Sequence, residues 1–306
     1  MNHPLHLLYR FLRLLGLSVL ALLFTRCKPT EQNATDPDTN TKAVYQVVAT
    51  TGMIADIVRE IGGERVNVHQ IIGEAVDPHS YKASVTDVKA LQDADLTFYN
   101  GLLLEGKMAD VLARLGKTGR PFVALAEEVM ANESYAHRDL LRAGDPHLWM
   151  DVEGWIQAVD CVAATLIKMD PKREEQYQQD AERYRMQLLE MDDYAKKSLV
   201  SIPKQQAVLI TSHRAFDFLS RAYGIETHAI QGISSESETG LKNIESLIDL
   251  IVHRNIPAVF IESSVSEKNI LALIEGARAR GHQMSLGGVL FSDAMGPPGS
   301  YEGTYI

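Results

Sequence analysis

The amino-acid sequence predicts an α/β fold with two βα lobes, each built on a parallel sheet and joined by one long helix. Two observations indicate the lobes: short β-branched runs alternate with segments of helical periodicity over residues 43–169, and again over 203–306. A third observation indicates the connecting helix, because residues 170–202 form one helix-forming run without a glycine. The expected architecture is therefore two lobes on a helical spine, with a cleft between them.

The first 26 residues have the layout of a secretory signal peptide. Arg10 and Arg13 precede the apolar run 14–24, which is too short to span a bilayer as a helix. Cys27 follows at the position where a bacterial lipoprotein is cleaved and acylated. We therefore expect an exported protein, in the periplasm or at the cell surface, that is attached to the membrane through a lipidated Cys27.

Arg26 departs from this pattern, since a lipoprotein signal prefers a small residue just before the cysteine. The alternative is an uncleaved anchor in which Cys27 is incidental. Residues 27–42 are polar, contain proline and lack apolar periodicity, so we expect them to form a flexible tether.

In the first lobe, β-branched runs mark the strands and apolar residues at helical spacing mark the helices. Gly62 and Gly63 end the first helix, and Asn100 and Gly101 follow the third strand. The predicted strands are 43–50, 65–72, 95–99 and 121–125, and the predicted helices are 53–61, 84–94 and one that begins near Val152.

The predicted spine has apolar residues at spacings of three and four along its whole length. Pro171 suits the first helical turn and Pro203 stops the run. Roughly 30 residues with a rise of about 1.5 Å each give a rod of about 45 Å. A surface-charged coiled coil is the alternative. A single stiff helix between two lobes should permit only small lobe movements.

The second lobe repeats the alternation of strands and helices after residue 203. Its predicted strands are 207–211, 225–230, 258–261 and 283–290, and its predicted helices are 215–223, 241–254 and 267–280. Because strand and helix alternate, both lobes are expected to have parallel strands with helices on the sheet faces.

Composition excludes one class of partner and leaves little room for disulfides. The formal net charge of −10 argues against a nucleic-acid partner, because phosphate binding needs clustered lysine and arginine. If Cys27 is lipid-modified, Cys161 has no disulfide partner, and its apolar neighbours predict a small core residue.

Four turns place a potential metal ligand at, or close to, the end of a predicted strand. They carry His79, His147, His213 and Asp293. Open α/β sheets bind ligands outside the carboxyl ends of their strands, so all four side chains can converge on one cleft, two from each lobe. A lone histidine at a strand end is more often an ordinary loop residue. Here, however, the tripeptide Asp-Pro-His occurs twice, and proline presents each histidine from a stiff turn.

The acidic residues of the two tripeptides have two open interpretations. Asp77 and Asp145 could orient an imidazole, or they could serve a turn or cap. The other histidines lack a comparable context, and we interpret them as signal, surface or structural residues: His3, His6, His69, His137, His228, His253 and His282.

Beyond these turns, the sequence resembles the zinc- and manganese-binding solute-binding lipoproteins of bacterial metal ABC importers, the TroA-like periplasmic family. The matching segments run in order through nearly the whole chain after residue 42: DPHSY (77–81), ADLTFYNGLLLE (94–105), DPHLWMD (145–151), TSHRAFDFLSRAYGIE (211–226), AVFIESS (258–264) and LFSDAMGPPGSYEGTY (290–305). Together they are highly specific.

The resemblance implies that His79, His147, His213 and Asp293 hold a metal ion between the lobes and that a membrane permease receives it. The transported ligand would be Zn²⁺ or Mn²⁺, with Fe²⁺ a further candidate, and nothing suggests obligate assembly beyond a monomer. In that family the third ligand is often Glu in manganese-type members and His in zinc-type or mixed members. The His-rich loop of zinc-dedicated members is missing from residues 126–146.

The donor set itself favours zinc without deciding the transported ion. Three imidazoles and one carboxylate suit tetrahedral Zn²⁺. A bidentate Asp293 would raise the coordination number and make Mn²⁺ or Fe²⁺ acceptable, although intrinsic affinity favours zinc. We therefore predict tighter zinc binding in vitro, with manganese retained as a candidate for the transported ion.

The resemblance also implies a departure at the end of the chain. The sequence stops at Ile306, where the family usually continues into a final helix. The expectation is a C-terminal lobe that lacks this helix, exposes apolar surface and is less stable.

Two other functions compete with metal transport. An exported zinc-dependent hydrolase could use three histidines and an aspartate, but the sequence has no His-Glu-x-x-His or Gly-x-Ser-x-Gly motif. Four protein ligands would also leave little room for substrate. A surface adhesin is compatible with the resemblance, although no residue supports it. We therefore predict a binding protein and not an enzyme.

Overall fold

The computed structural model describes residues 44–238 and 240–306. The signal peptide, Cys27 and the tether predicted for residues 1–42 lie outside the described residues. Among the helices that the structure describes, none is long and apolar enough to cross a membrane.

The N-terminal lobe is built on a four-stranded parallel sheet with strand order β2-β1-β3-β4. β1 is central, and Val47 pairs with Val68 on one side and with Leu96 on the other. Because all four strands are parallel, their carboxyl ends lie at the same edge of the sheet. The strands are β1 (Tyr45–Ala49), β2 (Val66–Gln70), β3 (Leu96–Tyr99) and β4 (Phe122–Ala124).

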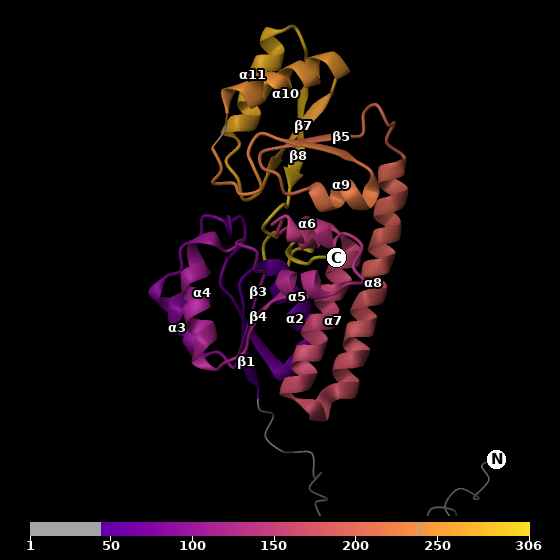
Figure 1. Cartoon of the computed structure of the whole chain (residues 1–306). Helices are drawn as coiled ribbons and strands as arrows, with labels where there is room; N and C mark the ends of the chain where they lie inside the picture. The colour runs from indigo at the N-terminus through magenta and orange to yellow at the C-terminus, as the bar shows by residue number, and fades with distance from the viewer. Residues whose placement is uncertain (1–43, 239) are drawn as a thin grey trace, which may run out of the picture. The chain divides into compact units, whose positions relative to one another are not determined.

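Helices cover both faces of this sheet (Figure 1). Alternate residues of β1 point to opposite faces: Val47 and Ala49 join the main core with α2, α5, α7 and α8, whereas Val48 packs on the side of α3 and α4. The helices of this lobe are α2 (Gly52–Gly62), α3 (Val85–Asp93), α4 (Ala109–Leu115), α5 (Leu125–Ala131), α6 (Arg138–Arg142) and α7 (Val152–Met169).

Three of these helices, α4, α5 and α6, were not predicted from the sequence. Each is only 5–7 residues long, which is too short to show a helical period in the apolar residues. The longer helices have clear local signals. Ser84 forms a capping box with Asp87 at the start of α3, and Asp151 accepts a hydrogen bond from the backbone N–H of Glu153 at the start of α7.

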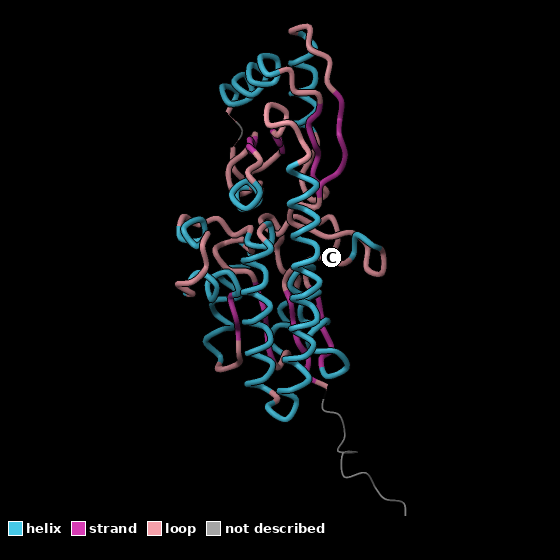
Figure 2. The backbone as a smooth tube through the Cα atoms, turned by 90° about the vertical axis from the view of Figure 1, so that its right-hand side faces the viewer, coloured by secondary structure: helices cyan, strands magenta, loops and turns pink. Residues whose placement is uncertain are grey.

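The predicted spine is present as the short 3-10 helix η5 (Pro171–Arg173) followed by α8 (Glu174–Val200), which has 27 residues. At a rise of about 1.5 Å per residue, α8 alone spans about 40 Å. The apolar positions of its first half, from Tyr177 to Leu188, are buried against the N-terminal lobe, and those of its second half are half-buried. Figure 2 shows this helix running alongside both lobes.

The C-terminal lobe contains two separate pairs of parallel strands instead of one continuous sheet. β5 (Val208–Thr211) pairs with β6 (Glu226–Ala229), and β7 (Ala258–Glu262) pairs with β8 (Ser285–Leu290). β5 and β7 are neighbours in space but share no ladder of hydrogen bonds. The helices of this lobe are α9 (Asp217–Tyr223), α10 (Leu241–Arg254) and α11 (Lys268–Ala279).

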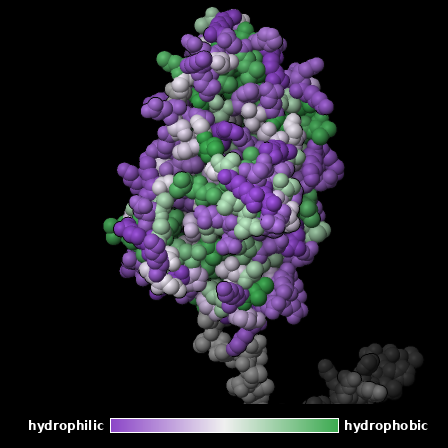
Figure 3. All heavy atoms as spheres, in the orientation of Figure 1, coloured by the Kyte–Doolittle hydropathy of each residue, from purple (hydrophilic) through white to green (hydrophobic). Residues whose placement is uncertain are grey.

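Polar side chains cover most of the face seen in Figure 3, with apolar patches between them. β8 is exposed along most of its length, and the exposed fractions of Leu286 and Val289 are 41% and 52%. Both lobes have the parallel strands that the sequence predicted, and the long helix joins them. The predicted fold class is therefore confirmed.

Candidate metal centre

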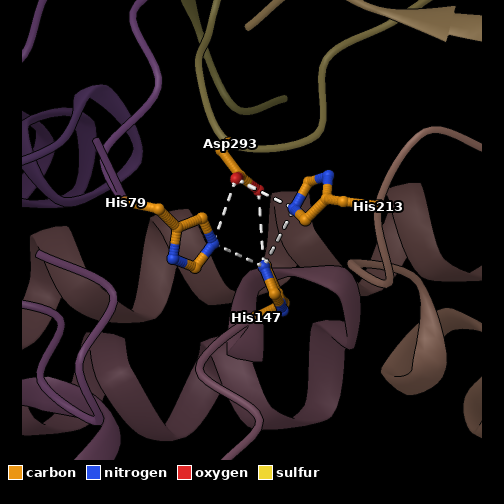
Figure 4. Close-up of side chains that lie close together, drawn as sticks. All are labelled: His79, His147, His213 and Asp293. Atoms are coloured by element: carbon orange, nitrogen blue, oxygen red, sulfur yellow. Dashed lines mark hydrogen bonds and ion pairs between the residues drawn. The ribbon is translucent and has the colours of Figure 1, made fainter. Parts of the chain in front are cut away.

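Four loops bring His79, His147, His213 and Asp293 together where the two lobes meet (Figure 4). His79 lies in the loop after β2, and His147 directly precedes the 3-10 helix η4 (Leu148–Met150). His213 follows β5 and Asp293 follows β8. Two of the four side chains therefore come from each lobe, and their candidate ligand atoms all lie within 4.8 Å of one another.

The donor atoms surround a single point. The Nε2 atom of His147 lies 3.4 Å from Nε2 of His79 and 3.3 Å from Nε2 of His213. Asp293 Oδ2 lies 3.1 Å from Nε2 of His213 and 3.5 Å from Nε2 of His79, and Oδ1 lies 3.6 Å from Nε2 of His147. Donors at about 2.05 Å from a tetrahedral zinc ion are about 3.3 Å apart, so these separations fit such an ion.

The burial of this group makes a bound cation the natural partner of its carboxylate. The exposed fraction is 4% for His79 and no more than 1% for the other three side chains. Apart from the three imidazoles, neither buried oxygen of Asp293 has a polar partner within the described residues. A buried carboxylate is costly unless a cation balances its charge, and a metal ion at the point faced by the three imidazoles would satisfy both oxygens.

Two carboxylates orient the imidazoles of His147 and His213. The Nδ1 atom of His147 lies 2.7 Å from Asp145 Oδ1, which also accepts the backbone N–H of His147 at 3.1 Å. The Nδ1 atom of His213 lies 2.6 Å from Glu262 Oε2. The other oxygen of Glu262 accepts the backbone N–H groups of Ser212 and His213. A proton on each Nδ1 donates to its carboxylate and leaves the Nε2 lone pair free for a metal.

The loop that carries Asp293 is held from the opposite lobe. The indole N–H of Trp149 donates to the backbone carbonyl of Ser292 at 2.6 Å. The hydroxyl of Tyr305 in turn donates to the carbonyl of Trp149 at 2.5 Å. The residue directly before Asp293 is therefore anchored to the segment that follows His147.

Comparison with known protein families shows which family the chain belongs to. Residues 47–306 match the family described as zinc-uptake complex component A, periplasmic (ZnuA). The chain belongs to the ZnuA family.

Two similar relatives of this ZnuA-family chain are named for different metals. It is 43% identical over 265 residues to the manganese-binding lipoprotein MntA of Bacillus subtilis (strain 168), covering 85% of this chain and 84% of that protein. It is 41% identical over 260 residues to the zinc-binding protein TroA of Treponema pallidum (strain Nichols), covering 85% and 83%.

The solved structure of the periplasmic zinc-binding protein TroA from Treponema pallidum aligns with a TM-score of 0.80 at 41% identity, covering 86% of this chain and 94% of that one. The resemblance to metal-binding lipoproteins that the sequence indicated is therefore confirmed.

In this ZnuA-family site, burial and the neighbouring charges shift the pKa values of His79, His213 and Asp293 in opposing directions. Burial alone would lower the pKa of His213, but the adjacent carboxylates of Asp293 and Glu262 outweigh it and raise that pKa well above its usual value. For His79, burial dominates and lowers the pKa to about 4. Burial would raise the pKa of Asp293, yet the imidazoles, His213 first, bring it below its usual range.

The structure separates the two interpretations of the acidic residues that precede the histidines. Asp145 contacts the imidazole ring of His147 directly. Asp77 instead accepts the backbone N–H of His79 at 2.9 Å, which is the turn role. Sequence reasoning did not single out Glu262. Its sequence signals are its place as a lone acidic residue at the end of the apolar run of β7 and within the family-like segment AVFIESS.

The remaining histidines of the ZnuA-family chain are placed away from this cluster where the structure describes them. His137 pairs with Asp151 at 2.8 Å, and His228 pairs with Glu226 at 2.7 Å. Across residues 44–238 and 240–306, no other group of His, Cys, Asp or Glu side chains is arranged to hold a metal ion.

Proposed function

We propose that this protein captures a divalent transition-metal ion, Zn²⁺ or Mn²⁺, outside the cytoplasm and delivers it to the membrane permease of an ABC importer. The observation that carries the proposal is the convergence of His79, His147, His213 and Asp293, which we assign as the metal ligands. Three Nε2 atoms and a buried carboxylate that has no other polar partner within the described residues face one point at tetrahedral spacing. Membership in a family of metal-uptake components supports the same function.

The geometry favours binding over catalysis. A catalytic zinc ion keeps an open position for water or substrate, usually with three protein ligands. Here four protein donors face the same point and are at most 4% exposed. Neither the family nor the names of the relatives support an exported hydrolase or a surface adhesin. We therefore assign the metal ion as cargo.

The proposed arrangement at the membrane rests on the sequence and is supported by the names of the relatives. We propose that the protein is attached to the membrane through a lipidated Cys27, because relatives such as MntA are named lipoproteins. We also propose that it works as a monomer, since no feature of the sequence indicates obligate assembly. Replacement of Cys27 by serine should then release the protein from the membrane fraction. Retention of the serine variant in that fraction would contradict lipid attachment.

Zinc should bind more tightly than manganese in vitro. Three imidazoles favour zinc, whereas the two oxygens of Asp293, which contact different imidazoles, also permit bidentate binding and thus manganese. Competition dialysis of the purified protein against equal concentrations of the two ions, followed by elemental analysis, should find zinc in the site. Displacement of bound zinc by an equal concentration of manganese would overturn this order. Elemental analysis of protein from its native source identifies the transported ion.

Metal affinity should fall as the pH is lowered from 8 to 6. A raised pKa means that His213 holds a proton near neutral pH in the metal-free protein, and a metal must expel it. Since the pKa of His79 is lowered to about 4, that ring is neutral throughout this range and contributes no proton.

Titration calorimetry at pH 7 in buffers of different ionisation enthalpy should therefore detect release of about one proton per ion. Binding without proton release, or with an affinity that does not change between pH 6 and 8, would contradict the assignment of His213 as the protonated ligand.

A further inference from the structure

A loop of the C-terminal lobe, residues 231–237, reaches across to the N-terminal lobe beside the metal centre. The hydroxyl of Ser235 donates to Asp77 Oδ2 at 2.6 Å, and both side chains are partly buried. Next to this bond, Lys107 and Glu236 form an ion pair between the same two lobes. That pair is more exposed, with 37% and 47% of the side chains accessible, so it contributes little by itself.

The acceptor of the Ser235 hydrogen bond is the residue that shapes the His79 turn. One oxygen of Asp77 accepts the backbone N–H of His79 at 2.9 Å. The other oxygen accepts the hydroxyl of Ser235. A single carboxylate therefore ties the backbone of a metal-site residue in one lobe to a side chain in the other lobe.

The base of the 231–237 loop is fixed to the segment that carries His213. The backbone N–H of Gln231 donates to the carbonyl of Ser212 at 2.9 Å, and the N–H of Arg214 donates to the carbonyl of Gly232 at 3.0 Å. The side-chain amide of Gln231 also donates to the carbonyl of Ser235 at 2.6 Å. The position of Ser235 is therefore set by the turn that presents His213.

We propose that Ser235 is a positioning residue that couples the closed arrangement of the lobes to the placement of His79. The path runs from the His213 turn through the loop to Ser235, then to Asp77 and the backbone of His79. This inference rests on the proposed function, and it adds a residue whose hydroxyl bonds to Asp77 and not to any of the four proposed ligands. Because the Ser235–Asp77 bond joins the two lobes beside the site, its loss should act on metal release more than on capture.

The test measures metal dissociation from the full-length protein. Zinc-loaded wild type and Ser235→Ala are mixed with excess chelator in a stopped-flow instrument, and association is measured separately. A hydrogen bond to a carboxylate stabilises the state that contains it enough to change a rate by about tenfold. We therefore expect zinc to dissociate about tenfold faster from Ser235→Ala, with association nearly unchanged. The matched control is Ser237→Ala, the same substitution in the same loop, which should release zinc at the wild-type rate.

Two further variants separate positioning from a general loss of structure. Ser235→Thr keeps the hydroxyl and should dissociate close to the wild-type rate. In an Asp77→Ala background, adding Ser235→Ala should change dissociation little, because the two residues act through one bond. An equal acceleration by Ser235→Ala in both backgrounds would overturn the proposal, as would wild-type release from Ser235→Ala itself.

The failure of this inference is distinct from the failure of the proposed function. If wild-type protein binds neither zinc nor manganese, the proposed function fails and the inference fails with it. If wild type binds normally and Ser235→Ala releases zinc at the same rate, only the role of Ser235 is refuted.

Discussion

Replacement of His213 by alanine is expected to reduce zinc affinity by more than the roughly 10- to 100-fold that loss of an orienting partner usually costs. The variant removes one of four donors and leaves the fully buried carboxylate of Asp293 with one fewer positive partner. It also leaves Glu262 Oε2 without the imidazole that it contacts at 2.6 Å. Isothermal titration with zinc measures the loss directly, and His79→Ala should lose most binding as well.

His137→Ala is the matched control for these variants. His137 also lies in a loop, between α5 and α6, but it pairs with Asp151 and lies outside the cluster. Its replacement should leave zinc affinity unchanged. Equal losses for His79→Ala, His213→Ala and His137→Ala would contradict the assignment of the metal ligands.

Replacement of Glu262 by glutamine is expected to weaken zinc binding by about 10- to 100-fold, although the side chain keeps its shape. One oxygen of Glu262 must accept the backbone N–H groups of Ser212 and His213, so the amide nitrogen of glutamine would face His213 Nδ1. If the amide N–H of glutamine donates at this position, Nδ1 of His213 must be unprotonated to accept the hydrogen bond. The ring proton then moves to Nε2, the atom that faces the other candidate ligands.

Asp145→Asn provides a control with the same change of charge beside another histidine of the site. A single oxygen, Oδ1, accepts both the backbone N–H and the Nδ1 proton of His147, and the other oxygen has no hydrogen bond within the described residues. Asparagine can keep its carbonyl oxygen at the Oδ1 position and preserve the tautomer of His147. We expect a loss of less than about tenfold.

The two variants are compared by zinc titration and by the melting temperature of the metal-free protein. Equal losses of affinity, or a larger loss for Asp145→Asn, would show that charge and not tautomer controls the site. A large fall in melting temperature for Glu262→Gln alone would instead point to the two backbone hydrogen bonds that Glu262 accepts.

Much of the fold could be predicted because its signals are local. The β-branched run at 43–50 and the uninterrupted helical period after Pro171 each depend on neighbours within a few residues, so they are visible without any tertiary structure. The confirmed spine shows the limit of such signals. Its apolar stripe continues to Leu199, but only the half before Met191 is buried, because the N-terminal lobe covers only that part.

The candidate site could be predicted where its residues lie in turns that have a recognisable sequence pattern. The Asp-Pro-His tripeptides and the strand-end positions of His213 and Asp293 pointed to four side chains, and the structure brings these four together. Their role as metal ligands stays a prediction that the alanine variants test. The family resemblance was also accessible from sequence, since its segments extend in order over most of the chain.

By itself, then, the sequence determined the order of the strands and of the longer helices, the family, and the side chains that could hold a metal. Only the tertiary structure decided which partners those side chains have. Glu262 lies 49 residues from His213, and Ser235 lies 158 residues from Asp77. Hydrogen bonds over such separations leave no periodic trace in the sequence, because they depend on tertiary packing, within the C-terminal lobe for Glu262 and between the lobes for Ser235, and not on local propensity.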